Sequence, residues 1–323
     1  MSIYVSIAAY EDRLLINTIC DALAKARNEE DIVFGIALQY EKLPDLSFLN
    51  ENQKRIIVYN PKTRPGIIEI RKRLKNMCHE DYFLQIDAHT DFYVDWDIKL
   101  IEQLKNAKKI ENSEMVILSS HLDNFIGQTN SPDGRNIYNY QILNNDAGGN
   151  WMLASNISKQ KYKIDKELLK SYNIGAGFIF ADKKFVDEIE YDQYSSVAYE
   201  EVYLSYKLFM LGWSIYAPHT FSYLSHDLKK SEIQFRNSLF QRYQESPTGK
   251  LVKTFAGINK DTFDTYKQIN TALIYNDFSK YAIKDAIKTT ADFWTAIGLF
   301  DFYAEQRRTL SLLDKDIIKN YPT

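Results

Sequence analysis

Aspartate and histidine side chains follow one apolar run in a pattern that suits metal chemistry. Residues 82–86 read Tyr-Phe-Leu-Gln-Ile, and Asp87, His89 and Asp91 come directly after them. Aromatic and β-branched residues fill this run, which is typical of a buried central strand. Asp87 and His89 are therefore expected at the end of that strand, where open α/β sheets bind their ligands.

Asp87 and His89 are separated by a single residue. On an extended backbone such residues point to the same side, so that one cation can contact both. A carboxylate oxygen combined with an imidazole nitrogen suits Mn²⁺ or a related divalent ion. We therefore expect a metal site that holds a diphosphate, although the same pair also follows many strands that bind no metal.

The composition describes a chain that can bury a large core. Its 323 residues are 45% hydrophobic and 26% charged, with a formal net charge of -3. This length fits one catalytic domain with an appendage, or two domains. The basic residues are dispersed among acidic ones, which gives no reason to expect nucleic acid as a partner. Two cysteines, Cys20 and Cys78, do not favour a disulfide framework.

Targeting and membrane signals are not recognisable in the sequence. The first residues lead straight into a strand pattern without a basic flank. No apolar run approaches the roughly 20 residues that a membrane helix requires. We therefore expect a cytoplasmic protein without an integral membrane segment.

The first part of the chain alternates strand and helix patterns. We expect strands at residues 3–8, 31–39, 55–59 and 82–86, and helices at residues 14–26 and 66–74. This order is typical of a nucleotide-binding α/β half. The turn after the first strand lacks a glycine-rich phosphate loop. Something other than glycine amides must therefore neutralise the phosphates, and a metal ion would do so.

The middle of the chain continues with a helix at residues 96–107 and a strand at residues 115–119. Residues 128–150 are rich in Asn, Asp and Gly, and a loop of this length is mobile or functional. From about Lys229 onward the pattern is helical, as in residues 293–313. We expect a catalytic domain at residues 1–228 and a helical region at residues 229–323, which serves packing, acceptor binding or homo-oligomer formation.

Seven segments of residues 1–228, in this order, resemble one family of enzymes. They are IYVSIAAYEDRLLINTI, VFGIALQ, GIIEIRKRL, YFLQIDAHTDF, GAGFIFA, EEVYLSYKLFMLGW and APHTFSYLSHD. The chain is similar to the metal-dependent, retaining GT-A glycosyltransferases. It resembles most directly the cytoplasmic polypeptide α-N-acetylglucosaminyltransferases of glycosyltransferase family 60, and more distantly the polypeptide N-acetylgalactosaminyltransferases. The resemblance implies an α/β fold with a Rossmann-like GT-A central sheet and a C-terminal helical appendage.

The resemblance also implies the metal ligands. Asp87 and His89 match the Asp-x-His motif of the family, and Asp87 would also reach the ribose or a phosphate oxygen. His226, at the end of an expected strand at residues 220–225, matches the later histidine that completes the metal site. His219 is the competing assignment, since a histidine directly after a proline also fits an ordinary loop.

Five further residues match the nucleotide side of the family. Ala8, Tyr10 and Arg13 correspond to the wall that receives the uridine nucleotide, and Gln39 corresponds to a residue that faces the base. Arg71 would neutralise the diphosphate through its planar guanidinium group. For Arg13 and Arg71 the alternative is a solvated helix face, and for Gln39 a strand end in solvent.

Five other residues match the sugar side. The small residues Gly175, Ala176 and Gly177 would let a sugar approach the backbone closely; a tight turn into a core strand is the alternative. Glu200 and Glu201 would contact hydroxyl groups of the donor sugar or the acceptor, although two acidic residues also suit the first turn of any helix. The residues before this pair are not the glycines of the family, which leaves the shape of the acceptor side open.

The activity implied by the resemblance is sugar transfer. The donor would be a UDP-sugar, with N-acetylglucosamine preferred, and the cofactor Mn²⁺ or Mg²⁺. The acceptor would be a hydroxyl of a protein or glycan, with retention at the anomeric carbon. A metal-dependent phosphohydrolase that uses Asp87, His89, Asp91 and His121 is one alternative, and a non-catalytic UDP-sugar-binding protein is another.

Overall fold

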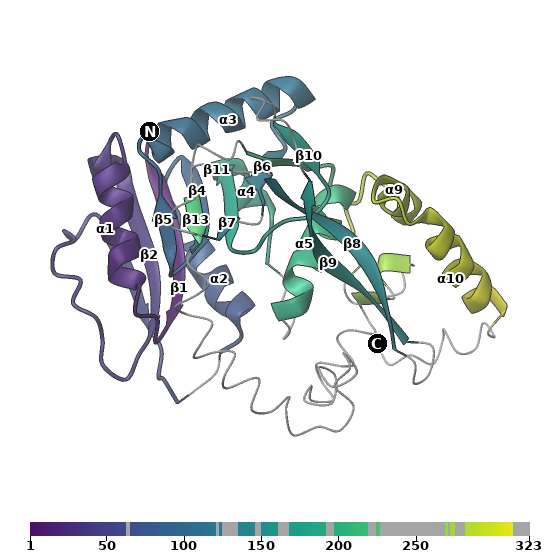
Figure 1. Ribbon diagram of the computed structural model, residues 1–323, viewed down its shortest axis with the longest axis horizontal. Helices are drawn as coiled ribbons and strands as arrows, with labels where there is room; N and C mark the ends of the chain where they lie inside the picture. Colours follow the sequence, from purple (N-terminus) through teal and green to yellow (C-terminus); the bar gives the residue numbers. More distant parts are fainter. Residues whose placement is uncertain are drawn as a thin grey trace.

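A mixed eight-stranded β-sheet runs through the middle of the molecule (Figure 1). The structure is a computed structural model that describes residues 1–62, 65–120, 123–124, 135–145, 150–160, 168–191, 197–218, 224–226, 269–270, 272–274 and 282–312. The sheet has the order β10-β12-β6-β11-β4-β1-β2-β3. Its strands are β1 (Ile3–Tyr10), β2 (Ile32–Gln39), β3 (Lys54–Val58), β4 (Tyr82–Asp87), β6 (Val116–Ser119), β10 (Leu169–Ser171), β11 (Phe178–Asp182) and β12 (Ser214–Ala217).

Helices cover both faces of this sheet. They are α1 (Leu15–Lys25), α2 (Ile67–Asn76), α3 (Trp96–Glu111), α4 (Lys183–Glu188) and α5 (Val197–Met210), with a short 3-10 turn η1 (Glu29–Asp31) before β2. Strand residues alternate between the two faces. On β1, Ile3, Val5 and Ile7 pack with α1 and α3, whereas Tyr4 packs in the other core with α2, α4 and α5. This alternation explains why the central strands read as nearly continuous apolar runs.

The expected strands and helices of the first half are confirmed, with ends that shift by a few residues. The strand expected at residues 3–8 continues to Tyr10, and the one at 82–86 includes Asp87. The helix expected at residues 96–107 extends to Glu111. Gly66 is the N-cap residue of α2 and not part of the helix.

The loop expected at residues 128–150 is wrong over much of its length. Strands β8 (Arg135–Asn145) and β9 (Asn150–Gln160) pair in register as a long antiparallel hairpin that lies over α5 (Figure 1). The many Asn residues obscured a segment that also contains Tyr and Ile, which favour strands. The hairpin is anchored in the core by Leu153, which is fully buried, and by Tyr140, whose hydroxyl donates to the carbonyl of Tyr172 at 3.0 Å.

A small second sheet joins three distant segments. Strand β5 (Thr90–Phe92) pairs antiparallel with β13 (Leu224–His226), which pairs in parallel with β7 (Asp123–Asn124). In this sheet the segment just after Asp87 lies beside residues 224–226, which are more than a hundred positions later in the sequence.

The described C-terminal residues include helices α9 (Thr290–Ala296) and α10 (Phe300–Leu312). The apolar run at residues 293–313 is therefore two helices, because Gly298 adopts a positive φ of 74° after α9. Phe293 and Trp294 of α9 are buried in the same core as α5. Of the helical pattern expected from about Lys229 onward, residues 229–268 lie outside the described residues.

Candidate active site

The carboxyl ends of neighbouring strands assemble the candidate site. In the pairing of β1 with β4, Ala8 lies opposite Asp87, and in the pairing of β1 with β2, Tyr10 lies opposite Gln39. On the other side of β4, Phe178 pairs with Ile86, which brings Gly177 alongside Asp87. Residues that are far apart in the sequence therefore form one row across the edge of the sheet.

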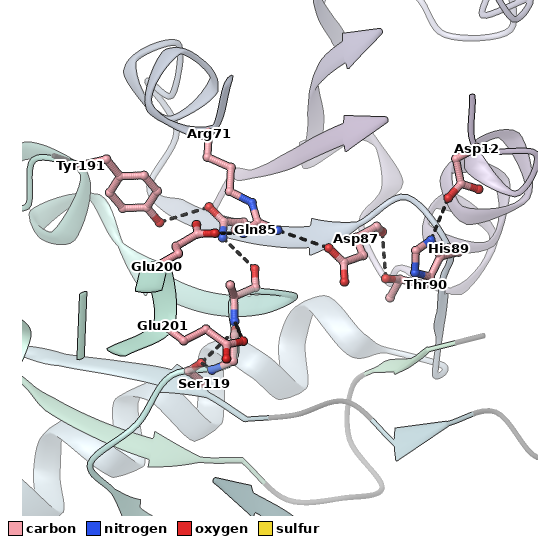
Figure 2. Close-up of polar contacts among 12 residues, drawn as sticks. Asp12, Arg71, Gln85, Asp87, His89, Thr90, Ser119, Tyr191, Glu200 and Glu201 are labelled. Atoms are coloured by element: carbon pink, nitrogen blue, oxygen red, sulfur yellow. Dashed lines mark hydrogen bonds and ion pairs between the residues drawn. The ribbon is translucent and has the colours of Figure 1, made fainter. Parts of the chain in front are cut away.

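Asp87 lies at the centre of this row (Figure 2). The hydroxyl of Thr90 donates to the backbone carbonyl oxygen of Asp87 at 2.9 Å, and this hydrogen bond fixes the turn after β4. A Cβ atom on Gly177 would lie 2.6 Å from Oδ2 of Asp87. Since real Cβ atoms do not approach that closely, only glycine fits at position 177 while the carboxylate keeps its place.

Arg71 of α2 holds two carboxylates together. Its Nη1 lies 2.5 Å from Oε2 of Glu200, and its Nη2 lies 3.3 Å from Oδ1 of Asp87 (Figure 2). The Arg71 side chain is 8% exposed and that of Glu200 only 1%. Burial alone would lower the pKa of Arg71, but the charges of Glu200 and Asp87 raise it above its ordinary value. The guanidinium group is therefore a fixed positive charge beside Asp87.

The two glutamates at the start of α5 have different surroundings. Oε1 of Glu200 is buried and has no hydrogen-bond partner among the described residues. Glu201 accepts a hydrogen bond from the backbone N–H of Ala176 at 3.0 Å. Burial raises the pKa of Glu201 to about 7, helped by the charge of Glu200 and opposed by the Ala176 hydrogen bond and by Arg71. Glu201 can therefore change its protonation state near neutral pH.

Buried hydrogen bonds hold the segment of small residues before β11. Gln85 donates to the carbonyl of Ala176 at 2.8 Å and accepts from the hydroxyl of Tyr191 at 3.1 Å (Figure 2). The backbone N–H of Gly175 donates to Oγ of Ser119 at 2.9 Å. These contacts make the segment a rigid floor next to Asp87.

His89 contacts a residue that sequence reasoning missed. Its Nδ1 lies 2.7 Å from Oδ2 of Asp12, while Oδ1 of Asp12 accepts from the backbone N–H of Leu14 at 2.8 Å. The hydroxyl of Tyr40 donates to the carbonyl of Asp12 at 2.8 Å. In the sequence, an Asp just before a helix indicates only a turn or a cap. The contact of Asp12 with a histidine 77 positions later has no local sequence signal.

The backbone of His226 runs next to the candidate metal ligands. His226 pairs with Thr90 in the antiparallel pairing of β13 with β5, one residue from His89. Its side chain is not among the described ones, so its role as a third ligand stays a prediction. His219 and His121 lie outside the described residues.

The donors around Asp87 fit a divalent cation. Among the side chains that the structure describes, no His, Cys, Asp and Glu residues form a group of three or more that could hold a metal ion. Asp87 and His89 would provide one oxygen and one nitrogen ligand, and Nδ1 of His89 contacts the carboxylate of Asp12, as the outer nitrogen of a metal-bound histidine often does. A cation bound to this pair would take its other ligands from substrate oxygens and water.

The remaining nucleotide-side residues lie at the same edge with different exposure. Tyr10 is 58% exposed and Arg13 is also exposed, just before α1. Gln39 is buried, and its amide donates to the carbonyl of Asn60 at 3.1 Å. The amide of Gln39 therefore already contacts the loop after β3. Its predicted contact with a base stays a prediction.

A comparison with protein families decides the family of the chain. The family described as Glycosyltransferase (GlcNAc) matches residues 73–302, which is well over half of the chain. The chain belongs to this glycosyltransferase family. The match includes Asp87, His89, the floor before β11 and both glutamates of α5. A comparison with curated proteins gives no match.

Two solved structures show that this glycosyltransferase has the GT-A fold. GalNAc-T7, crystallised with UDP, GalNAc and Mn²⁺, superposes with a TM-score of 0.54 at 14% identity over 87% of this chain and 49% of that chain. TarS of S. aureus, crystallised as residues 1–349 with UDP-GlcNAc, superposes with a TM-score of 0.52 at 10% identity over 93% of this chain and 71% of that chain. The glycosyltransferase thus spans about half the length of the GalNAc-T7 chain.

The described helices of the glycosyltransferase are all too short or too polar to cross a lipid bilayer. This agrees with the absence of long apolar runs noted in the sequence.

Proposed function

We propose that the protein transfers a sugar, N-acetylglucosamine by preference, from a UDP donor to a hydroxyl group of a protein or glycan. The reaction depends on a divalent cation, Mn²⁺ or Mg²⁺, and retains the configuration of the anomeric carbon. The observation that carries the proposal is the position of Asp87 at the strand ends, between Ala8 and Gly177, with Arg71 on one side and His89 two residues on. The GlcNAc family match and the sugar nucleotides named for GalNAc-T7 and TarS support the donor class.

Asp87 and His89 would hold the cation, with His226 as the proposed third ligand. The cation would supply positive charge that stabilises the departing UDP. Arg71 adds a permanent positive charge beside Asp87, and one of its five N–H groups beyond the two that contact Glu200 and Asp87 can donate to a phosphate oxygen. These charges act where negative charge develops, which is the main requirement for a diphosphate leaving group.

The sugar would lie on the floor formed by residues 175–177. Gly177 must lack a side chain, because a Cβ atom there would meet the Asp87 carboxylate. The small residues of this segment would let the sugar approach the backbone closely. The unpartnered Oε1 of Glu200 is a buried acceptor that a hydroxyl group of the sugar can satisfy. Glu201 is the next residue. Near neutral pH it can accept a proton from a hydroxyl group or donate a proton to one.

No side chain is assigned as a nucleophile in this proposal. In a retaining transfer of this kind the acceptor attacks from the face that UDP leaves, and the departing phosphate can take the acceptor proton. Ala8, Tyr10, Arg13 and Gln39 would form the nucleotide side, and the C-terminal helical region would help to bind the acceptor. The specific likeness to glycosyltransferase family 60, the boundary near residue 228 and a cytoplasmic location belong to the same proposal.

The proposal is tested by incubating the protein with a panel of UDP-sugars and Mn²⁺ and measuring the release of UDP. Release should be highest with UDP-GlcNAc and should stop when EDTA is added. The Asp87→Asn variant should lower the rate by about 10²–10³, because it weakens the binding of the cation that would stabilise the charge developing on UDP. Release of inorganic phosphate instead of UDP would favour a phosphohydrolase, and binding without turnover would favour a sugar-nucleotide-binding protein.

A further inference from the structure

The contact between Asp12 and His89 links two segments that the proposed function treats separately. Asp12 lies in the turn between β1 and α1, and His89 lies in the turn after β4. The two side chains are 12% and 17% exposed, and the Oδ2 and Nδ1 atoms are 2.7 Å apart (Figure 2). An ionised carboxylate can only accept hydrogen bonds. Nδ1 of His89 must therefore carry a proton, and in the neutral ring the lone pair is on Nε2.

Asp12 is itself held in place on every polar side. Its Oδ1 accepts from the backbone N–H of Leu14 at 2.8 Å. The hydroxyl of Tyr40, from the residue directly after β2, donates to the Asp12 carbonyl at 2.8 Å and accepts from the Asp12 N–H at 3.1 Å. One contact holds the carboxylate of Asp12 and two hold its backbone, which fixes the plane and the tautomer of the imidazole that the carboxylate contacts.

We infer that Asp12 is a positioning residue for the metal site, which presents Nε2 of His89 to a divalent cation. This inference rests on the proposed function, because it takes Asp87 and His89 as the cation ligands. A histidine ligand is oriented and made more basic when its second nitrogen donates to a carboxylate. Asp12 lies between Tyr10, the last residue of β1, and Arg13. The hydrogen bond between His89 and Asp12 therefore connects the proposed nucleotide wall with the proposed metal ligand.

The chain offers a matched control for this position. Asp45 makes the same kind of turn, since its Oδ1 accepts from the backbone N–H of Ser47 at 2.9 Å, two residues later. A substitution of Asp45 therefore removes the turn contact of an aspartate without touching a histidine. Asp12→Ser keeps a hydroxyl that can accept from Leu14 but is too short to reach His89. Asp12→Asn loses the charge and has one acceptor oxygen for two donors, the backbone N–H of Leu14 and Nδ1–H of His89.

The first measurement is the affinity for Mn²⁺, alone and with UDP present, followed by electron paramagnetic resonance. Removing an outer contact of this kind lowers metal affinity by about 10–100-fold. Asp12→Ser should show the full loss, Asp12→Asn a smaller one, and Asp45→Ser none. His89→Ala should bind Mn²⁺ at least as weakly as Asp12→Ser. Equal Mn²⁺ affinity in wild type and Asp12→Ser would overturn the inference.

The second measurement reads the tautomer directly, by nitrogen-15 NMR of labelled histidine in alkaline buffer without metal, with His89→Gln to assign the signal. The wild type should carry the proton on Nδ1, whereas Asp12→Ser should shift it to Nε2. A contact that only ties two loops together would change the melting temperature and leave the Mn²⁺ affinity of Asp12→Ser unchanged. A proton on Nε2 in the wild type would also overturn the inference.

These readouts separate the inference from the proposed function. If Mn²⁺ affinity follows the Asp12 series but no UDP-sugar is consumed, the proposed function fails and the positioning role of Asp12 stands. If the wild type binds no Mn²⁺ even with UDP, the metal role of His89 fails and the inference with it.

Discussion

Arg71 is the residue on which the charge balance of the candidate site depends. It faces Glu200 from α5 and Asp87 from β4, and both ion pairs are within 3.3 Å. A buried carboxylate left without its partner is strongly destabilising, whereas the intact pair is close to neutral for stability. The Arg71 guanidinium therefore matters more for holding two acids at one place than for the total stability of the fold.

Arg71→Lys tests this geometry. A lysine keeps the charge but loses the planar fork that contacts two carboxylates at once. We expect the free energy of unfolding to fall by about 1–3 kcal/mol, since one buried charged hydrogen bond is lost. Arg73→Lys is the matched control on the same helix, because Arg73 is exposed, where it pairs with Glu69 and lies over the ring of Tyr59. This variant should change stability by less than about 1 kcal/mol. Urea unfolding of both variants checks this, and equal effects would contradict the role of Arg71.

Gly177→Ala tests the close approach at Asp87. The new Cβ atom would lie 2.6 Å from Oδ2 of Asp87, so the carboxylate or the floor must move. We expect a loss of about 1–3 kcal/mol in stability, as for other overpacked sites, and weaker binding of Mn²⁺. Gly66→Ala is the control, because nothing lies within 4 Å of its Cβ position. Gly177→Ala with unchanged stability and unchanged Mn²⁺ affinity would contradict the close contact between this position and the Asp87 carboxylate.

At the scale of elements, the described C-terminal helices are attached to the catalytic sheet through one shared core. Phe293 of α9 packs edge-on against Tyr206 of α5, and Tyr140 of the β8–β9 hairpin contacts Phe293 as well. The indole N–H of Trp294 donates to the carbonyl of Leu273 at 2.6 Å. Helix α9 therefore contributes to the support behind Glu200 and Glu201, which stand at the other end of α5.

Thr289→Ala tests the N-terminus of α9. Thr289 accepts from the backbone N–H of Asp292, and Asp292 accepts from the N–H of Thr289, so the two form a capping box. Its loss should cost about 0.5–2 kcal/mol of unfolding free energy. Thr295→Ala is the control in the same helix, since its hydroxyl only bonds back to Ala291 and alanine is the better helix former. Thermal unfolding that shows equal losses in both variants would contradict the capping role.

The sequence predicted those elements whose patterns are local. The apolar runs at residues 3–8, 31–39 and 82–86 identified β1, β2 and β4, and the rule for strand ends placed Asp87 at the sheet edge. The β8–β9 hairpin was missed because its Asn-rich composition resembles a loop, and the antiparallel position of β11 beside β4 has no local signal.

At the scale of the whole molecule, the site depends on contacts between residues that are distant in the sequence. Arg71 and Glu200 are 129 positions apart, and Asp12 and His89 are 77 apart. Such pairs follow from the topology of the sheet, which propensities and periodicity do not contain. This explains why Arg71 was assigned to a phosphate alone, and why Asp12 was not recognised at all.

Stability should depend on pH through Glu201. Its pKa is about 7 in the folded protein, above the ordinary value of 4.5 that applies when the chain is unfolded. Between these values the folded state binds more protons than the unfolded state, so the contribution of Glu201 to stability falls as pH rises from about 4.5 to 7 and is constant above. Glu201→Gln removes this dependence. We therefore expect the stability of Glu201→Gln relative to wild type to increase over that range, as measured by urea unfolding at several pH values. A constant difference would contradict the raised pKa.

The central claim is that a divalent cation binds between Asp87, His89 and the diphosphate of a UDP-sugar at the carboxyl end of β4. A crystal structure of the protein with UDP and Mn²⁺ tests it most directly, because manganese can be located by its anomalous scattering. The account predicts one anomalous peak in contact with the Asp87 carboxylate, Nε2 of His89 and phosphate oxygens. UDP bound at another place, or bound at this edge with no peak beside Asp87 and His89, would contradict it.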